Sequence, residues 1–404
     1  MAAMTRQSKN ASTARVVVVG GGVAGCATAI ALARTGVSDV VVLDASPTQR
    51  IRVGETIPPD ARRLLMLLGL GAAFDAEGHA PCYGSASSWG SDELGFNDHF
   101  VHPLGHGYHL DRQKFDAWMG TSAEQAGARR IRGARVTDVR RVGDHWQLEI
   151  SPARTALASG LAEQRITADM LIDATGVLSA LGRRLGGRRL EHDRLTYLAC
   201  TLAPDPDGSR SGLTWLEATR DGFWYAAELP DGTFTLAITT DGDVVRAQQL
   251  FTRDGFFRAF EETRHLVPLL RHRICRDDKP SAWTAHSSLL GPPAGPAWLA
   301  VGDAAAAYDP ISARGIHKAL EDGLRAATAV RDTLRGDRDA ISRYACHSIL
   351  AFRTYLEQRA YLYAQESRWP DAPFWKRRAT RRNLLGGEST PSSHIRSRLE
   401  NQHV

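Results

Sequence analysis

Two glycine-rich segments, more than 270 residues apart, contain the residues with the clearest chemical potential in this chain. The first is Gly20-x-Gly22-x-x-Gly25, which follows the β-branched run 16–19 and opens a predicted helix at 23–35. In such a motif the first glycine permits a tight turn, the second lets backbone approach a pyrophosphate, and the third lets helix pack on strand. The helix N-terminus also attracts phosphate, because its free amides carry partial positive charge.

Asp44 adds a second contact for a dinucleotide. It stands 24 residues after Gly20, at the end of the predicted strand 39–44, where a carboxylate accepts hydrogen bonds from ribose hydroxyls. The first amides of the predicted helix belong to Val23 and Ala24, and we expect them at the phosphates. The segment therefore predicts a dinucleotide-binding βαβ unit; the alternative is an ordinary glycine turn beside a solvent-facing carboxylate.

The second glycine-rich segment begins at Gly302-Asp303 and continues through Pro310 to Gly315 and Ile316. A carboxylate at Asp303 can hold a ribityl hydroxyl, and the amides that follow Pro310 can face the edge of a flavin. A ligand that stretches from the first segment to the second is FAD rather than NAD. The alternative for Asp303 is a simple helix cap.

Residues 80–110 are rich in glycine, serine, histidine and aromatic residues, and we expect loops and strands that cover the active site. His106 and His109 are candidate bases that take a proton from an aromatic ring; the alternative is that they only hydrogen-bond the loop. Glu55 either orients the substrate and steadies flavin protonation, or pairs with an arginine.

Five further residues are candidate substrate contacts, because they lie in or beside the segments predicted to wall the pocket. Taken singly, the aromatic members more often belong to a core, and the glutamate is more often an exposed strand residue. These candidates are Trp89, Trp224, Tyr225, Glu228 and Tyr308.

The order of elements predicts an α/β fold. We expect a Rossmann-type FAD-binding domain with a glutathione-reductase-like βαβ unit, an inserted mixed or antiparallel β-sheet lobe for the substrate, and a helical C-terminal region. The expected boundaries are a disordered tail at 1–13; an FAD-binding domain at 14–80, 111–187 and 273–335; a substrate lobe at 81–110 and 188–272; and a C-terminal helical region and tail at 336–404.

Composition excludes several classes of protein. The chain has 404 residues, 43% of them hydrophobic, and a formal net charge of +5, but its basic residues are scattered, so we expect no nucleic-acid partner. Its five cysteines form no CxxC pair, so we predict no metal site and no disulfide framework, as suits the cytoplasm. No apolar run approaches ~18 residues, so no transmembrane segment is expected.

The motifs, taken in order, resemble the flavin-dependent halogenases and their hydroxylating relatives among the para-hydroxybenzoate-hydroxylase-like FAD monooxygenases. Besides the two segments above, they comprise Gly54-Glu55-Thr56-Ile57-Pro58, Arg112-x-x-Phe115-Asp116 and Asp173-Ala-Thr-Gly176. The resemblance covers about residues 15 to 330. It implies Arg112 near the phosphates of FAD, Asp303 at the ribityl chain, and Glu55 with Thr56 beside the isoalloxazine.

Three departures from the halogenase pattern favour hydroxylation. Halogenases of this family pass hypohalous acid to a lysine, whereas the matching stretch 81–89 has none, and no lysine occurs between Lys9 and Lys114. Arginine cannot replace that amine. The family's tryptophan motif is only partial at 223–230, and Arg314 stands where small residues normally surround halide and flavin. Halogenation remains the alternative.

Shorter stretches resemble flavoproteins that hydroxylate a tryptophan of a partner polypeptide during maturation of tryptophylquinone cofactors. They are Ser88-Trp89-Gly90-Ser91, residues 105–112, Phe223-Trp224-Tyr225, Tyr308-Asp309-Pro310 and residues 374–378. The resemblance implies oxygen transfer from O₂, through a flavin C4a-hydroperoxide, to an indole or another electron-rich ring, in a polypeptide or a small molecule.

Electrons would come from NAD(P)H or from reduced flavin supplied by a partner reductase, and no second GxGxxG is present. The remaining alternatives are an aromatic hydroxylase of natural-product biosynthesis, an isoprenoid reductase and a non-enzymatic flavin-binding scaffold.

Overall fold

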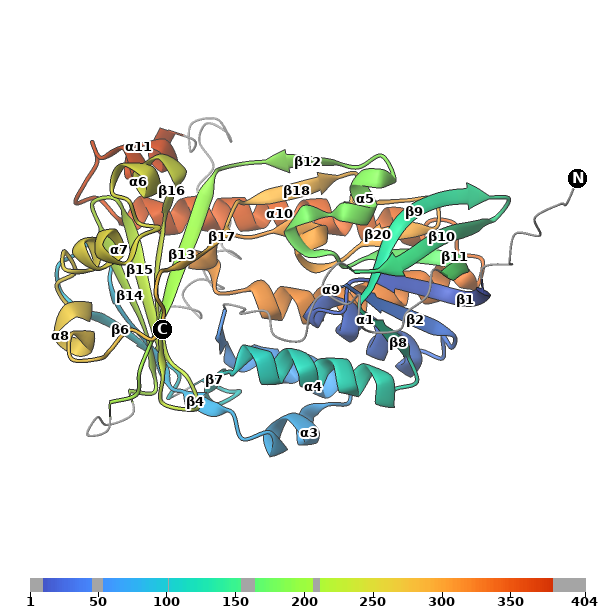
Figure 1. Ribbon diagram of the computed structural model, residues 1–404, viewed down its shortest axis with the longest axis horizontal. Helices are drawn as coiled ribbons and strands as arrows, with labels where there is room; N and C mark the ends of the chain where they lie inside the picture. The colour runs from blue at the N-terminus through green and yellow to red at the C-terminus, as the bar shows by residue number, and fades with distance from the viewer. Residues whose placement is uncertain (1–9, 46–53, 101, 154–163, 206–210, 381–404) are drawn as a thin grey trace, which may run out of the picture.

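The computed structural model describes residues 10–45, 54–100, 102–153, 164–205 and 211–380. One half is built on an eight-stranded sheet with the strand order β19-β20-β11-β1-β2-β8, to which β9 and β10 add an antiparallel extension beside β11. The other half is a seven-stranded sheet with the order β17-β13-β16-β15-β14-β5-β6. The long helix α10 runs along both halves (Figure 1).

The first half is a parallel sheet buried on both faces. β1 (Asn10–Val19) pairs in parallel with β11 (Gln164–Asp173) and β2 (Val40–Asp44). Alternate valines of β1 enter separate cores: Val16 and Val18 pack toward helices α1 and α9, and Val17 and Val19 toward β10 and β20. A strand with two buried faces needs a continuous apolar run, which explains the four consecutive valines.

The helices α1 (Val23–Arg34) and α9 (Gly315–Leu334) pack against each other on one face of this sheet. The remaining strands of the sheet are β8 (Arg129–Arg132), β9 (Ala134–Val142), β10 (His145–Pro152), β19 (Ala294–Gly295) and β20 (Trp298–Ala300). The strands β9, β10 and β11 pair as antiparallel neighbours.

The seven-stranded sheet contains the alternating runs that the sequence predicts for the substrate lobe. Its strands are β5 (Gly84–Ser88), β6 (Gly95–Asp98), β13 (Leu195–Leu202), β14 (Leu213–Thr219), β15 (Gly222–Glu228), β16 (Phe234–Asp241) and β17 (Ser281–Thr284). One face is covered by α6 (Gly242–Ala247), α7 (Arg253–Phe260) and α8 (Leu266–Leu270).

The remaining elements lie between and around the two large sheets. Their helices are α2 (Pro59–Leu67), α3 (Gly71–Ala76), α4 (Arg112–Gln125) and α5 (Ala180–Arg184). Their strands are β3 (Thr56–Ile57), β4 (Ala80–Cys82), β7 (Gly107–His109), β12 (Arg188–Glu191), β18 (Ser288–Gly291) and β21 (Ala306–Ala307), and the 3₁₀ turns are η2 (Gly176–Leu178), η3 (Gly302–Ala304) and η4 (Pro310–Ser312). Two three-stranded sheets, β12-β18-β21 and β3-β7-β4, lie among them.

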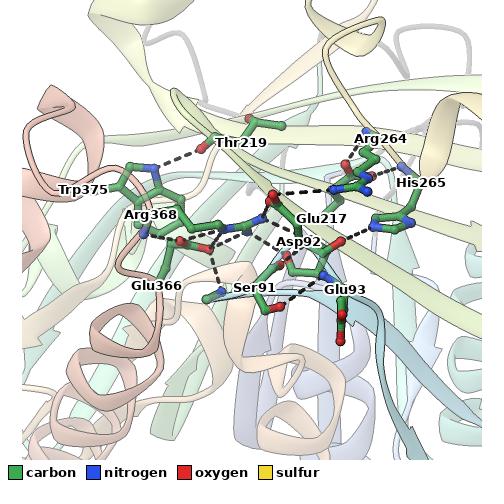
Figure 2. Close-up of polar contacts among 12 residues, drawn as sticks. Ser91, Asp92, Glu93, Glu217, Thr219, Arg264, His265, Glu366, Arg368 and Trp375 are labelled. Atoms are coloured by element: carbon green, nitrogen blue, oxygen red, sulfur yellow. Dashed lines mark hydrogen bonds and ion pairs between the residues drawn. The ribbon is translucent and has the colours of Figure 1, made fainter.

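The C-terminal region consists of α10 (Ala340–Gln365) and α11 (Pro373–Thr380). The loop between them is fixed to the seven-stranded sheet by charged side chains (Figure 2). Arg368 binds the buried carboxylate of Glu366 at 2.6 Å and Asp92 at 2.8 Å. Nearby, Glu217 of β14 accepts hydrogen bonds from the backbone amides of 264–266 at the start of α8. These contacts hold α10 and α8 on the sheet.

The predicted α/β class with its inserted sheet is confirmed, while two boundaries differ. β1 begins at Asn10, inside the expected tail, because its first residues pair with β11. β17 belongs to the seven-stranded sheet although it was expected in the FAD-binding domain, because it pairs with β13. The helix α11 lies within the expected C-terminal helical region and tail, and its Phe374 and Trp375 are buried against the sheet.

Candidate cofactor site and active site

The turn between β1 and α1 is shaped as the glycine motif predicts. Gly20 has φ +121°, and a Cβ there would collide with the carbonyl oxygen of Ala174. A Cβ on Gly25 would collide with the carbonyl oxygen of Gly20, so the helix packs directly on the turn. Gly22 begins α1 without a side-chain cap. The first amides of α1, including those of Val23 and Ala24, are therefore available to an anion.

Asp44 lies against this turn. A Cβ on Gly21 would stand 2.5 Å from Asp44 Oδ2, so the carboxylate contacts the glycine loop. Asp44 is buried, and its Oδ2 also accepts a hydrogen bond from Arg130 Nη2 at 2.5 Å. Arg130, which the sequence did not single out, neutralises the carboxylate and fixes its orientation beside the turn.

The two glycine-rich segments meet in the structure. Gly302 has φ +58°, and a Cβ there would stand 2.6 Å from the Cβ of Ala24 in α1. Lys318 Nζ donates hydrogen bonds to the Gly302 carbonyl oxygen at 2.8 Å and to Asp322 Oδ2 at 2.7 Å. The contact of Gly302 with Ala24 supports one ligand that touches both segments, and the buried Lys318 adds a positive charge that sequence reasoning missed.

Asp303 is exposed to solvent at this junction, although protein atoms enclose it on several sides. This enclosure raises the pKa of Asp303, and the positive charges of Lys318, Arg189 and Arg112 oppose the rise. A solvent-facing carboxylate among cations is suited to accept hydrogen bonds from the hydroxyls of a bound ligand. The cap alternative is not needed, since Asp303 makes no side-chain cap bond.

The turn before α9 is braced from behind by α10. Asp309 is completely buried, and its Oδ2 accepts hydrogen bonds from Arg359 Nε and Tyr363 OH, both at 2.8 Å. Tyr355 OH accepts from the Asp309 amide at 2.7 Å. Tyr308, a predicted substrate residue, stacks on Tyr355 with ring centroids 3.9 Å apart. The observed contact of Tyr308 is therefore a packing contact within the protein, which is the alternative to a substrate contact.

Beyond this brace, Pro310 opens the short η4 turn, and α9 starts at Gly315 without a side-chain cap. Ile316 is buried in the core beside α1. The free amides at the start of α9 thus form a second uncapped helix N-terminus, which can face a ligand as the first one does.

Glu55 lies in a pocket between the two halves. Its Oε1 accepts a hydrogen bond from Thr235 at 3.2 Å, and its Oε2 accepts from the Gly54 amide at 3.1 Å. Burial raises the pKa of Glu55, opposed by the positive charge of Arg112. Arg112 in turn donates to the Gly54 carbonyl oxygen at 3.0 Å and pairs with Asp116 at 3.3 Å. Arg112 therefore holds the segment that contains Glu55 and Thr56.

The cavity in this pocket has a volume of about 240 Å³. Besides Glu55 and Arg112 it is lined by residues of β13, β16 and β17, among them Cys200, Thr235 and Trp283. It therefore opens between the start of α4 and one end of the seven-stranded sheet.

Four side chains form a hydrogen-bonded group beside Glu55, here called the threonine cluster: Thr56, His109, Thr214 and Tyr225. Thr56 Oγ1 lies 3.1 Å from His109 Nδ1, 3.0 Å from Tyr225 OH and 3.3 Å from Thr214 Oγ1. Burial lowers the pKa of His109 to about 4, so its imidazole is neutral near pH 7. Thr56 and Tyr225 are only half-buried, so they form the open end of this chain of polar groups.

His106, the second predicted base, lies outside the threonine cluster. Its Nδ1 is 2.8 Å from the Gly107 carbonyl oxygen, and its ring contacts those of Tyr83 and Tyr108. The structure thus favours His109 as the histidine of the site. The contacts of His106 match the alternative in which it only hydrogen-bonds the loop.

Three other residues that were predicted to contact the substrate make contacts within the protein instead. Trp224 is completely buried on the α7 side of the sheet, against Phe256 and Phe260, so its prediction is wrong. Successive strand residues face opposite sides, and the neighbour Tyr225 is the one that reaches the site. Glu228 is also buried, and its Oε2 accepts a hydrogen bond from the Ser211 amide at 2.8 Å.

Trp89 packs against the C-terminal helices. Its indole Nε1 donates to the Leu362 carbonyl oxygen at 2.8 Å, and its ring lies 5.4 Å from that of Trp375. It therefore joins the seven-stranded sheet to α10 and α11 instead of forming part of the threonine cluster.

The residues present fit FAD. Two uncapped helix N-termini, a buried carboxylate at Asp44 and a solvent-facing carboxylate at Asp303 lie around the junction of the two glycine segments. The fold and this site define an FAD-dependent oxidoreductase. The chain belongs to the FAD binding domain family, whose model matches residues 13–346.

Relatives in this family include both oxidoreductases and halogenases. The chain is 26% identical over 364 residues to the FAD-dependent oxidoreductase LodB of Marinomonas mediterranea. The aligned region covers 90% of this chain and 96% of LodB. It is 27% identical over 350 residues to the flavin-dependent halogenase gsfI of Penicillium aethiopicum, covering 80% of this chain. The matched region spans 65% of that halogenase, just under two thirds of its length.

Among solved structures, the peptidyl tryptophan dihydroxylase QhpG, essential for tryptophylquinone cofactor biogenesis, superposes with a TM-score of 0.71. The two sequences are 25% identical, and the match covers 91% of this chain and 79% of QhpG. In the part of the chain that the structure describes, no helix has the length and apolar character needed to cross a membrane.

Proposed function

We propose that this protein is an FAD-dependent monooxygenase that hydroxylates the indole ring of a tryptophan within a polypeptide, with dioxygen as co-substrate. The observation that carries the proposal is the chemistry of the threonine cluster. It offers hydroxyls and a neutral imidazole at Thr56, Tyr225 and His109, and no amine among its members. A cluster of this kind can accept a proton, whereas it cannot form the chloramine that relays halogen.

When bound, FAD would supply the electrons that activate dioxygen, and dioxygen is the source of the oxygen atom that is transferred. The protein residues position the ring and manage its proton. We infer that the half-buried hydroxyls of Thr56 and Tyr225 face the ring, and that the proton released on oxygen transfer passes along Thr56 Oγ1 to His109 Nδ1. Because the pKa of His109 is about 4, the imidazole is unprotonated throughout the neutral range.

We assign the cofactor contacts from the same geometry. The amides of Val23 and Ala24 bind the pyrophosphate, Asp44 binds the adenosine ribose, and Asp303 binds the ribityl chain. Arg112 would keep Glu55 and Thr56 in place beside the isoalloxazine, and the uncapped backbone amides at the start of α9, up to Ile316, would face its pyrimidine edge. The similarity to QhpG, a peptidyl tryptophan dihydroxylase, supports the choice of an indole in a polypeptide.

Halogenation is the second candidate, and the relationship to gsfI favours it. None of the four residues of the threonine cluster carries an amine side chain. Lys318 uses its ammonium group on the Gly302 carbonyl oxygen and Asp322, and Lys114 is a surface residue with a side chain 75% exposed.

The two candidates separate in a single assay. The purified holoenzyme, a reductant, oxygenated buffer and equal chloride and bromide are incubated with a tryptophan-containing peptide, free tryptophan or a simple indole. Mass spectrometry then reports what each substrate gains. We expect one or more oxygen atoms on the peptide; a halogen on any of the three would overturn the proposal, and oxygen on the free compounds alone would restrict it to small molecules.

The source of electrons is tested in the same mixture with NAD(P)H as the only reductant. NAD(P)H is supplied with and without an added flavin reductase, and NAD(P)H oxidation and product formation are followed together. Product without the reductase shows direct use of NAD(P)H by the chain, whereas product only in its presence shows delivery of reduced flavin.

A further inference from the structure

Two buried thiols and a carboxylate gather where the end of β13 pairs with the segment that leads into β17, in a group separate from the threonine cluster. They belong to Cys200 in β13 and to Cys275 and Asp277 in the segment between α8 and β17. The two sulfur atoms and a carboxylate oxygen all lie within 4.8 Å of one another. Both cysteines are free and buried. The sequence gives no hint of this group, because 75 residues separate its two cysteines.

The strand register explains how the three side chains meet. An antiparallel bridge joins Leu202 to Cys275, which places Cys200 directly opposite Asp277 and diagonal to Cys275. The amide of Arg276 donates to the Thr201 carbonyl oxygen at 2.8 Å and fixes this register.

This register favours a bridging ion over a disulfide. Diagonal positions of an antiparallel pair are ~7–8 Å apart, beyond the Cα separation that a disulfide normally spans. A tetrahedral ion with metal–sulfur bonds of ~2.3 Å spans a wider gap between two sulfurs.

Neighbouring groups already orient the carboxylate. Asp277 Oδ2 accepts a hydrogen bond from the Thr201 amide at 2.6 Å. Arg253 Nη1 donates to the Asp277 carbonyl oxygen at 2.9 Å, and the guanidinium acts on Cys200 through its charge. Partners of this kind fix the ligands of metal sites. Two thiolates and one carboxylate around a divalent cation leave one net negative charge, which Arg253 offsets.

We propose that Cys200, Cys275 and Asp277 bind a divalent cation of the Zn²⁺ class. Two thiolates and a carboxylate are ligands that this ion accepts, and a site with three protein ligands keeps one coordination position open. Cys200 and Asp277 also line the 240 Å³ cavity that contains Glu55, which gives the ion an entry path. Binding replaces the two thiol protons, which pass to solvent, and ties the end of β13 to the segment that leads into β17.

The test uses the holoenzyme with its cysteine thiols reduced and any bound metal removed, and Zn²⁺ is the probe. Competition with a chromophoric chelator measures affinity, and elemental analysis measures stoichiometry. We expect one equivalent of Zn²⁺ in the wild type, and binding weakened by more than ~10-fold in Cys200→Ser and Cys275→Ser. The matched control is Cys346→Ser, because Cys346 is the exposed free cysteine, and it retains wild-type affinity. Equal affinity in all three variants overturns the proposal.

A second measurement covers the case in which the serine variants do not fold. Co²⁺ is titrated into the wild-type protein, and the visible d–d bands of tetrahedral cobalt are followed at wavelengths beyond the flavin absorption. Intense bands that saturate at one equivalent support the site. Weak octahedral bands overturn it, as does an intact mass of the fresh protein that reveals a disulfide between Cys200 and Cys275.

Discussion

Replacement of His109 with asparagine gives the sharpest test of the threonine cluster. The asparagine amide nitrogen stands near the position of Nδ1 and can keep the hydrogen bond to Thr56, but it does not titrate. Burial lowers the pKa of His109 from 6.5 to about 4 in the folded protein. The unfolded chain therefore binds more protons than the folded chain between these two values, and the wild type loses stability as pH falls through that window.

The size of the effect follows from the two pKa values. With 6.5 in the unfolded state and about 4 in the folded state, the histidine costs about 2 kcal/mol at pH 5 and about 3 kcal/mol at pH 4, relative to pH 8. The asparagine variant lacks this contribution. Its free energy of unfolding should therefore fall less than that of the wild type over the same range, by these amounts.

The assay is urea unfolding of the holoenzyme at pH 8 and pH 5, at one fixed concentration of FAD. Other groups that titrate between these values are common to both proteins, so they cancel when the two differences are subtracted. The control is His106→Asn, which alters a histidine outside the threonine cluster. If wild type and His109→Asn show the same pH dependence, His109 is not a buried neutral group and the reasoning fails.

Three more substitutions test the frame around the site. Gly302→Ala introduces a Cβ at φ +58° that stands 2.6 Å from Ala24, so we expect a loss of ~1–3 kcal/mol in stability and weaker FAD binding, measured by thermal unfolding and flavin fluorescence. Arg359→Met leaves the buried carboxylate of Asp309 uncompensated and should cost ~3–5 kcal/mol in urea unfolding. Glu217→Gln removes the charged acceptor of three backbone amides and should cost ~1–3 kcal/mol, with faster hydrogen exchange in α8.

Two of these substitutions have a matched comparison. Gly36→Ala places a Cβ at φ +82° with no neighbouring atom, so it carries the backbone strain without the collision and should leave FAD affinity unchanged. Arg325→Met breaks a surface pair with Glu321 and should cost less than ~1 kcal/mol. Equal costs for the two arginine variants would contradict the account of Asp309, and unchanged exchange in α8 would contradict that of Glu217.

Local patterns predicted the parallel half well. A run of four valines closed by glycines has few structural alternatives, because both faces of such a strand must be buried. The glycine positions were equally informative, since Gly20 and Gly302 occupy positive φ angles. The contact of Gly302 with α1 could be expected because one ligand was predicted to touch both glycine-rich segments.

Residues of the site that depend on packing between distant segments could not be predicted. Phe223, Trp224 and Tyr225 are consecutive aromatic residues, so alternation places aromatic rings on both faces of β15, and only the packing of α7 decides which face Trp224 occupies. Arg359 acts on Asp309 from 50 residues away. No local pattern reports a contact of this kind.

The same limit applies to the ionisable groups. His109 is neutral because it is buried beside Thr56. The sequence alone cannot distinguish it from His106, which binds the loop, because both histidines lie in the same glycine-rich stretch. The pairing of Asp44 with Arg130 joins residues 86 positions apart, and it arises because β2 and β8 lie side by side in the sheet.

Isotope labelling tests the central claim most directly. The holoenzyme turns over a tryptophan-containing peptide with a reductant under ¹⁸O₂ in unlabelled water, and the product is analysed by mass spectrometry. The account predicts that the oxygen newly bound to the indole carries the ¹⁸O label. A product whose new oxygen comes from water, or a product that carries a halogen in place of oxygen, would contradict it.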